Sequence, residues 1–289
     1  MKVRSPRITF ISLPLVFLCM ATAAQSQELW GRCSRGTLFH WGEGFTGGPD
    51  LDAPLVTDRP DFTEASSTVG WGVTQFEMGY TYTFDNDGTD QSISHSYPEP
   101  LMRRGILANW LELRLASNVT SDSINGSTTT GRADQYVGFK IGLTPQRRWL
   151  PEMALIPQMT VPTGSDNRTE DEWLPGVNWI YAWGIGENFS LGGSTQVNRA
   201  LDDVSDDFAE WAQSIAVGAS LTEKVGLYTE WYTIIPPSDA IGPETEHYLN
   251  GGFTYLINND VQWDIRAGIG LNDFSDDYFV GTGISIRLL

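Results

Sequence analysis

The sequence predicts an all-β protein, a transmembrane antiparallel up-and-down β-barrel of about 12 strands. After residue 72 the chain is a series of segments of roughly ten residues in which polar and apolar side chains alternate, and a period of two is that of a strand. Short and long connections alternate between these segments. Charged residues lie in mid-segment on the polar side, where the wet lumen of a barrel can hydrate them.

The first segment, residues 73–84, shows the alternation most clearly. Its even positions from Phe76 to Phe84 are all large apolar or aromatic residues, whereas its odd positions from Gln75 to Thr83 are polar or glycine. In a soluble sandwich the polar face would meet bulk water and the apolar face a core. In a membrane barrel the apolar face meets lipid and the polar face meets a lumen. This segment alone is compatible with both.

Eleven more segments follow with the same pattern. Pro98 and Pro100 interrupt the second, which makes it the weakest of the series. In the third, WLELRLAS, three leucines alternate with Glu112 and Arg114. The strands expected after the first are, in chain order, 92–103, 110–117, 135–144, 151–161, 174–185, 188–199, 209–221, 224–235, 246–257, 260–271 and 278–289.

The connections between these segments are alternately short and long. Short ones fall near residues 105–108 and 258–260, whereas residues 117–134 form the longest polar connection. Outer-membrane barrels have tight periplasmic turns and longer external loops, so the alternation favours that class. An even number of strands would leave both termini on the periplasmic side.

Charged side chains in mid-strand separate the membrane barrel from a soluble barrel or sandwich. In a packed soluble core such groups would be prohibitive unless they were paired. A lipocalin-like cavity would instead need an apolar interior and a polar exterior. The membrane barrel is therefore favoured, and the residues predicted to line its lumen are Gln75, Glu77, Glu112, Arg114, Lys140, Glu230, Asp264, Arg266 and Arg287.

The first residues are typical of a secretory signal peptide. Three basic residues precede an apolar run at 8–20, and the small residues that follow predict cleavage after Ala23 or Ala24. A membrane anchor is the alternative, but the run is too short to span and Pro14 interrupts it. We therefore expect residues 1–24 to be a signal peptide and the mature chain to be exported to the cell outer membrane of a Gram-negative bacterium.

Charge and cysteine content exclude several classes. The chain has 36 acidic and 18 basic residues, a formal net charge of −18, so its net field disfavours nucleic acid and anionic lipid. Cys33 is the single cysteine after residue 24, which excludes an internal disulfide framework and leaves a dimer link, a free thiol or an incidental residue. No later segment has the roughly 18 consecutive apolar residues of a membrane helix.

Residues 25–72 are predicted to be an irregular periplasmic N-terminal extension, followed by the barrel at 73–289. The extension is rich in glycine and aromatic residues and shows neither helical nor strand periodicity. Its last part contains Pro60 between charged residues, which disfavours a helix or a central strand. One interpretation is that this part lies at the mouth or enters the lumen and narrows the pore; the other is a solvated leader. The candidate plug or mouth residues are Asp58, Arg59, Asp61 and Glu64.

An enzyme would need a nucleophile and a base in or beside the barrel. The three histidines are His40, His95 and His247, and the serines on either side of His95 would point to the opposite face of a strand. We therefore expect no enzyme activity and no catalytic residues. Metal-ligand clusters, phosphate-binding glycine loops and dinucleotide fingerprints are absent from the sequence, so no metal and no cofactor is expected.

The stretch VTDRPDFTEASSTVGWGVTQFEMGYTYTF resembles the opening motif of an outer-membrane transporter-like β-barrel family, catalogued as the putative MetA-pathway of phenol degradation. RRGILANWLELRL, IPQMTVPTGSD, FSLGGSTQVN, LTEKVGLYTEWY and GGFTYLINNDVQWDIRAGIGLN are similar to later blocks of that family. The resemblance spans about residues 56–289. It implies a signal peptide, a barrel of about twelve strands and a role in moving small aromatic or hydrophobic molecules. The chain departs from many outer-membrane barrels in ending ISIRLL rather than in an aromatic residue.

The predicted function is an outer-membrane transporter or channel that passes small solutes, aromatic or hydrophobic compounds among them. The alternative is a structural or adhesion barrel with a closed lumen. The external loops are acidic, which favours cations at the outer mouth or is simply a solvated surface. Expected partners are outer-membrane lipid and lipopolysaccharide, the barrel-assembly machinery and a small-molecule solute, with no nucleic acid; the oligomeric state stays open.

Overall fold

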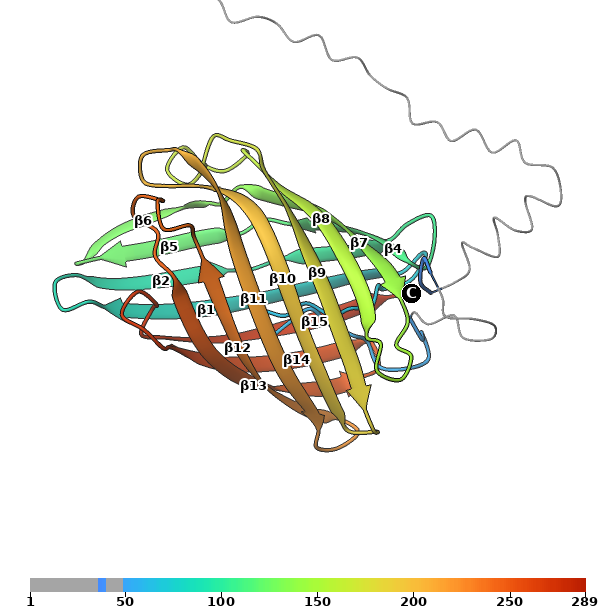
Figure 1. Ribbon diagram of the computed structural model, residues 1–289. Coiled ribbons are helices and arrows are strands. Elements are labelled where there is room, and N and C mark those ends of the chain that lie inside the picture. The colour runs from blue at the N-terminus through green and yellow to red at the C-terminus, as the bar shows by residue number, and fades with distance from the viewer. Residues whose placement is uncertain (1–35, 40–48) are drawn as a thin grey trace, which may run out of the picture.

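The computed structural model describes residues 36–39 and 49–289 (Figure 1). The predicted signal peptide and Cys33 lie outside these residues. No helix in the described residues is long and apolar enough to cross a membrane. The strands are β1 (Thr74–Asn86), β2 (Gln91–Tyr97), β3 (Leu101–Gly105), β4 (Leu111–Ala116), β5 (Val119–Ile124), β6 (Ser127–Arg132), β7 (Gln135–Thr144), β8 (Glu152–Val161), β9 (Leu174–Ile185), β10 (Phe189–Leu201), β11 (Asp207–Ser220), β12 (Val225–Ile235), β13 (Glu246–Asn258), β14 (Val261–Gly270) and β15 (Tyr278–Leu288).

These fifteen strands make up twelve barrel strands, which form a closed antiparallel barrel. Three barrel strands are each broken in two, so that β2 continues into β3, β4 into β5, and β6 into β7. Each strand pairs with its neighbours in antiparallel register, and β15 pairs with β1 from Thr74↔Leu288 to Phe84↔Tyr278. This last pairing closes the barrel, whereas β6, in the part of the wall beyond the breaks, pairs with β5 on one side only. The predicted fold class is confirmed.

The three breaks lie beside one another, at residues 98–100, 117–118 and 133–134. Asn118 bridges two of them, because its Oδ1 accepts hydrogen bonds from the backbone N–H of Glu99 (3.3 Å) and of Val119 (2.9 Å). Beyond the breaks, β2, β5 and β6 extend the wall past the loops of the other strands, at the left in Figure 1. The proline-interrupted second segment is therefore one barrel strand in two parts.

The connection at 117–134 differs from the expected polar loop, because most of it is the hairpin β5–β6. Asn125 and Gly126 form its turn, with φ of 50° and 86°. A two-residue hairpin needs positive φ at both central positions, and Asn-Gly is the sequence best suited to it. The strands on either side are rich in serine and threonine, so both faces are polar and the apolar alternation that marks the other strands is missing.

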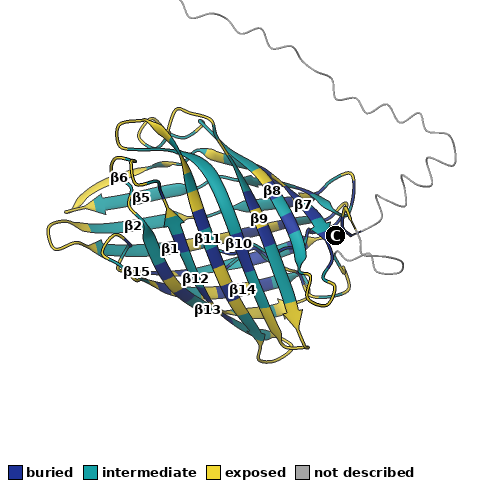
Figure 2. Ribbon diagram, in the orientation of Figure 1, coloured by how far each residue is buried: buried dark blue, intermediate teal, exposed yellow. Residues whose placement is uncertain are grey.

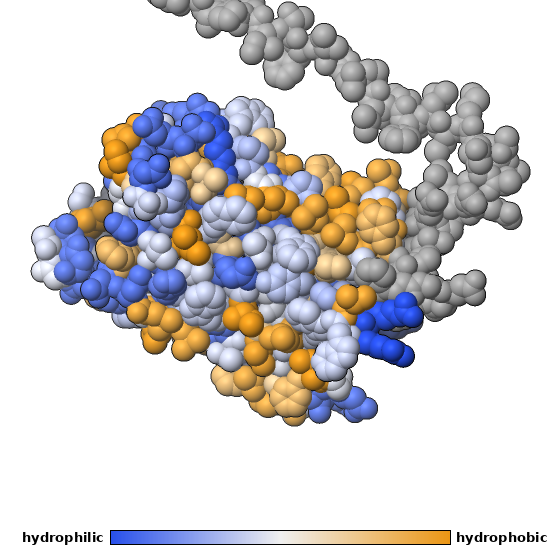
Figure 3. Space-filling model, in the orientation of Figure 1, coloured by the Kyte–Doolittle hydropathy of each residue, from blue (hydrophilic) through white to orange (hydrophobic). Residues whose placement is uncertain are grey.

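Alternation along each strand separates a lipid-facing side from a polar interior. In β1, Phe76 and Met78 are each 37% exposed, whereas Gln75 and Glu77 are 1% and 0% exposed. Figure 2 shows the resulting bands of buried and exposed positions along the strands, and Figure 3 shows apolar side chains over the visible wall with polar ones at the loop end. Among the described residues, the buried apolar cluster is small, with Ala154, Ile156 and Ile180, whereas most of the large, fully buried side chains are polar or charged, such as Arg103 and Lys140. The interior of the described chain is therefore predominantly polar.

Part of the extension predicted as periplasmic lies inside the barrel. Before it enters, Leu38 and Phe39 donate backbone hydrogen bonds to the end of β7, and Leu55 donates one to the turn between β13 and β14. These contacts are at the end that carries the short turns and the C-terminus, at the right in Figure 1. From there the chain enters the lumen, and we call residues 56–69 the inserted segment.

Candidate functional site

The inserted segment crosses the lumen and contacts the inner face of most barrel strands. It has no helical or strand structure of its own in this range, so its backbone N–H groups need other acceptors. Wall carboxylates supply them: Glu77 accepts from the N–H of Asp58 and Arg59, and Glu230 from that of Phe62 and Thr63. The wall side chains in polar contact with the segment are Gln75, Glu77, Arg103, Glu112, Arg114, Lys140, Glu152, Asn178, Ser214, Glu230, Gln262, Asp264 and Arg266.

Asp58 is the centre of the densest charge cluster. Its carboxylate pairs with Arg114, with Arg103 Nε at 3.3 Å and with Lys140 Nζ at 2.8 Å, and it is 6% exposed. Burial alone would raise the pKa of Asp58, but the three cationic side chains outweigh this and hold the pKa well below its usual range. The three cationic side chains therefore favour the ionised form of Asp58.

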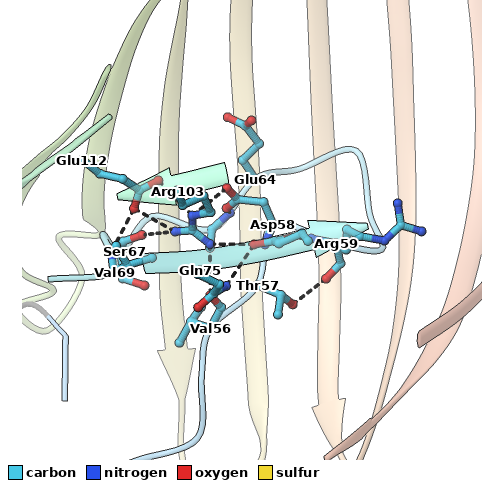
Figure 4. A network of polar contacts seen from close by, with 12 residues as sticks. Val56, Thr57, Asp58, Arg59, Glu64, Ser67, Val69, Gln75, Arg103 and Glu112 are labelled. Atoms are coloured by element: carbon cyan, nitrogen blue, oxygen red, sulfur yellow. Dashed lines mark hydrogen bonds and ion pairs between the residues drawn. The ribbon is translucent and has the colours of Figure 1, made fainter. Parts of the chain in front are cut away.

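Arg103 connects the carboxylates of Glu77 and Glu112 within this cluster, and it was not among the predicted residues. Its guanidinium donates to Glu112 Oε1 at 2.8 Å and to Glu77 Oε1 at 3.0 Å, and also to the backbone oxygens of Val56 (3.0 Å) and Ser67 (3.1 Å) (Figure 4). It is 0% exposed. Because the second segment is broken, its sequence pattern did not show on which face Arg103 lies. In the register with β1, Arg103 pairs directly with Gln75.

A second set of contacts lies around Arg59 and Arg266. The guanidinium of Arg59 pairs with Glu99 at 2.8 Å and with Asp264 at 3.3 Å, and in Figure 4 it points away from Arg103. Arg266 donates to the backbone oxygen of Pro60 at 2.8 Å. Glu64 extends the first set toward β9, because it pairs with Arg114 and accepts a hydrogen bond from Asn178 Nδ2 at 3.2 Å.

The structure places all nine predicted lining residues on the inner face. Eight of them contact the inserted segment, whereas Arg287 pairs with Asp260 at 2.7 Å and donates to the backbone oxygens of Leu51 and Ala53. Of the four candidate plug residues, Asp58, Arg59 and Glu64 form ion pairs with the wall or its connections. The fourth, Asp61, lies beside a cavity. Their role in conduction stays a prediction.

Two cavities flank the inserted segment. The inner cavity, of about 360 Å³, lies between residues 56–67 and the ends of β9 to β13 next to the short turns. The outer cavity, of about 340 Å³, lies at the strand breaks beside β3, β4 and β7. Glu64 lines both of them. Its contacts with Arg114 and Asn178 therefore lie at the place where one cavity could open into the other.

Aromatic side chains form a continuous stack on the inner face of β12, β13 and β15. Phe62 of the inserted segment stacks on Tyr232 with 4.5 Å between ring centroids, and Tyr232 stacks on Tyr248 at 4.8 Å. Tyr248 meets Phe279 edge-on at 6.2 Å, and the guanidinium of Arg266 lies 5.5 Å from the Phe279 ring. This stack was not predicted from the sequence, although Tyr232 shares the inward parity of Glu230 two residues before it.

Among the described residues, no group of three or more His, Cys, Asp or Glu side chains is arranged to hold a metal ion. What the site offers is charge, hydrogen-bonding groups and aromatic faces around narrow cavities. Such an arrangement can bind and sort small molecules by charge and shape.

Comparison with known proteins identifies the family. The chain belongs to the family described as putative MetA-pathway of phenol degradation, which matches residues 57–288; the resemblance read from the sequence is confirmed. No curated protein is similar enough in sequence to count as a relative.

Among solved structures, an outer-membrane channel from Pseudomonas putida F1 matches with a TM-score of 0.59 and 13% identity, covering 79% of this chain and 99% of that one. At this identity the likeness shows the fold. The NanC porin has a TM-score of 0.45 with 12% identity, covering 74% of this chain and 100% of its own. The KdgM porin also has a TM-score of 0.45, with 10% identity and coverage of 75% and 99%.

Proposed function

We propose that this protein is an outer-membrane channel for small solutes, and that the inserted segment controls passage through it. The observation that carries the proposal is the position of Glu64, which lines the cavities on both sides of the segment. A solute that moves between them has to pass this carboxylate and its partners Arg114 and Asn178. We include in the proposal an exported mature chain, lipid and lipopolysaccharide around the wall, and no catalytic activity.

The barrel and its interior support a transport role. A lumen of twelve strands is wider than that of a filled eight-stranded barrel and narrower than that of an open porin. The inserted segment narrows it further, so the solutes must be small. The charged groups of mixed sign inside the barrel suit molecules with at least one polar group.

The aromatic stack supports aromatic compounds among the solutes. Phe62, Tyr232 and Tyr248 present ring faces and edges along the inner wall, and aromatic rings attract other rings in offset or edge-on contacts. Because Phe62 belongs to the inserted segment and Tyr232 to the wall, an aromatic solute that competes for this contact would also loosen the segment. The family description, which refers to phenol degradation, agrees with this class.

Conductance of single channels in planar bilayers tests the proposal. The change is Glu64→Ala in the refolded mature protein, and the expected result is a clearly larger single-channel conductance than that of the unmodified protein, because the carboxylate between the cavities is gone. Arg114 keeps Asp58 and Glu112 as ion-pair partners, so the variant should still fold. Heat-modifiable migration on gels checks that it does.

Glu187→Ala is the matched control, because Glu187 is exposed in the short turn between β9 and β10. It should conduct like the unmodified protein. Equal conductance of all three proteins would contradict control at Glu64.

A structural or adhesion barrel with a closed lumen is the second candidate. The observation in its favour is the number of wall strands that the inserted segment contacts, since a segment held so firmly could simply fill the barrel. Solute flux separates the two functions. A folded and inserted protein that stays silent both unmodified and as Glu64→Ala would favour the closed barrel.

A further inference from the structure

The inner cavity contains two polar groups that no other part of the described chain uses. Tyr228 of β12 is 8% exposed and lines the cavity, and its buried hydroxyl has no hydrogen-bond partner. Asp61 lines the same cavity and takes part in no ion pair among those the structure describes; the one hydrogen bond to its carboxylate comes from its own backbone. Buried polar groups are normally satisfied, so an unpaired hydroxyl beside an unpaired carboxylate indicates a place for a ligand.

The charges around Asp61 favour a cation as that ligand. Burial raises the pKa of Asp61, and the neighbouring Glu230 raises it further, so a positive partner would be needed to keep it ionised. Of the cationic groups nearby, Arg59 is paired with Glu99 and Asp264, whereas Arg266 donates to Pro60 and Thr81, keeps a buried Nε without a partner and partly offsets the rise in the pKa of Asp61. An anionic ligand would meet the carboxylates of Asp61 and Glu64, and the cationic side chain in the cavity lining, Arg59, is already paired.

The rest of the cavity wall leaves room for a compact organic body. The inner positions of β10 and β11 at this level are small, with Ser190, Gly192, Ala216 and Gly218 in the cavity lining. The volume of about 360 Å³ is at the lower end of the range for small-molecule sites.

We infer that the inner cavity is a binding site for a small organic cation, whose ammonium group donates to the Asp61 carboxylate and the Tyr228 hydroxyl oxygen. This assignment rests on the proposed channel function and names a substrate class for it. The small residues of β10 and β11 then enclose the organic part, and Glu230 adds attraction at short range.

Calorimetric titration of the refolded protein in detergent micelles tests the site with three probes of nearly equal size. These are benzylammonium, benzyl alcohol and benzoate, each also titrated into empty micelles as the blank. Benzylammonium should bind at least about tenfold more tightly than the other two, because hydrogen bonds to a charged partner contribute more than neutral ones. Equal affinities, or tighter binding of benzoate, would overturn the assignment.

Two conservative variants locate the binding. Asp61→Asn keeps the shape and removes the charge, and should weaken benzylammonium binding about tenfold or more while leaving benzyl alcohol nearly unchanged. Tyr228→Phe removes the free hydroxyl and should weaken benzylammonium by a smaller factor. Asp273→Asn, on an exposed external loop, is the matched carboxylate control and should bind like the unmodified protein. An unchanged affinity in Asp61→Asn would overturn the site.

These titrations measure binding and not flux, so their outcome is independent of the conductance test at Glu64. Binding by a silent barrel would leave the cation site standing and remove the channel function. Conductance without selective binding of benzylammonium would support the channel function and remove the cation site.

Discussion

Two regions of the barrel wall meet the same inserted segment in different ways. On β1, β3, β4 and β7 the inner positions are long charged residues, and Arg103, Arg114 and Lys140 are at most 1% exposed. On β10 and β11 the corresponding inner positions are small, such as Gly192 and Ala216; they line a cavity beside the segment, and Ser214 contacts Thr63 directly. Both regions share the same strand alternation and the same lipid-facing side.

The comparison shows what sets the width of the lumen. The alternation of polarity determines which residues point inward. The size and charge of those residues determine whether the wall binds the inserted segment directly or leaves a cavity beside it. The charged region therefore accounts for the anchoring of the segment, and the small-residue region accounts for the space through which a solute could move.

The largest expected effect is on the anchoring side. Arg103→Ala leaves Glu77 and Glu112 buried with one cation fewer, and breaking a buried ion pair from one side typically costs about 3–5 kcal/mol. The free energy of unfolding, measured by urea titration in detergent with tryptophan fluorescence, should fall by an amount of that order.

Arg104→Ala is the matched control for this prediction. Arg104 is the next residue of β3 and is exposed on the outer side, so its loss should change the free energy of unfolding little. A similar loss for both variants would mean that the charge cluster does not anchor the segment.

A smaller effect is expected on the cavity side. Ala216→Trp places a large ring in the inner cavity and should reduce single-channel conductance by about half or more, because a buried tryptophan covers about 200 Å² or more of surface. Ile215→Trp is the control, since Ile215 is 49% exposed on the lipid-facing side. If the two variants conduct alike, the path does not run through this cavity.

The smallest effect concerns the outer mouth. Burial, with Glu246 and Asp85 nearby, raises the pKa of Asp276 in the loop between β14 and β15 to about 6. The carboxylate is therefore charged above that pH and neutral below it, so cation preference should decrease as the pH falls from 7 to 5. Reversal potentials across a salt gradient measure it.

In Asp276→Asn the decrease in cation preference between pH 7 and pH 5 should be smaller. In Asp273→Asn, which changes an exposed residue of the same loop, the decrease should be as large as in the unmodified protein. An equal decrease in cation preference in all three proteins would mean that other groups cause it.

The comparison also shows how far the sequence could predict this protein. Strand alternation was sufficient for the closed twelve-stranded barrel and for the inward side of residues such as Glu77 and Lys140. It failed where the period was lost: Pro98 and Pro100 hid the parity of Arg103, and the serine- and threonine-rich strands of the β5–β6 hairpin have no apolar face. The Asn125-Gly126 pair was a usable signal there.

The path of the inserted segment could not be predicted in the same way. Its contacts join residues far apart in the chain, such as Arg59 with Asp264 and Thr63 with Glu230, and an irregular segment has no periodicity from which such partners could be read. The sequence therefore left both interpretations open, with the solvated leader slightly favoured over lumen entry. Only the folded arrangement shows wall carboxylates accepting the backbone N–H groups of this segment.

The most direct test of the central claim is whether the inserted segment lies across the lumen of the membrane-inserted protein. Thr63 Oγ1 and Ser214 Oγ are 2.6 Å apart, close enough for two cysteines at these positions to form a disulfide. The measurement is mass spectrometry of Thr63→Cys/Ser214→Cys, in a Cys33→Ser background, after mild oxidation in lipid vesicles. The account predicts near-complete formation of this internal disulfide, whereas two free thiols would contradict it.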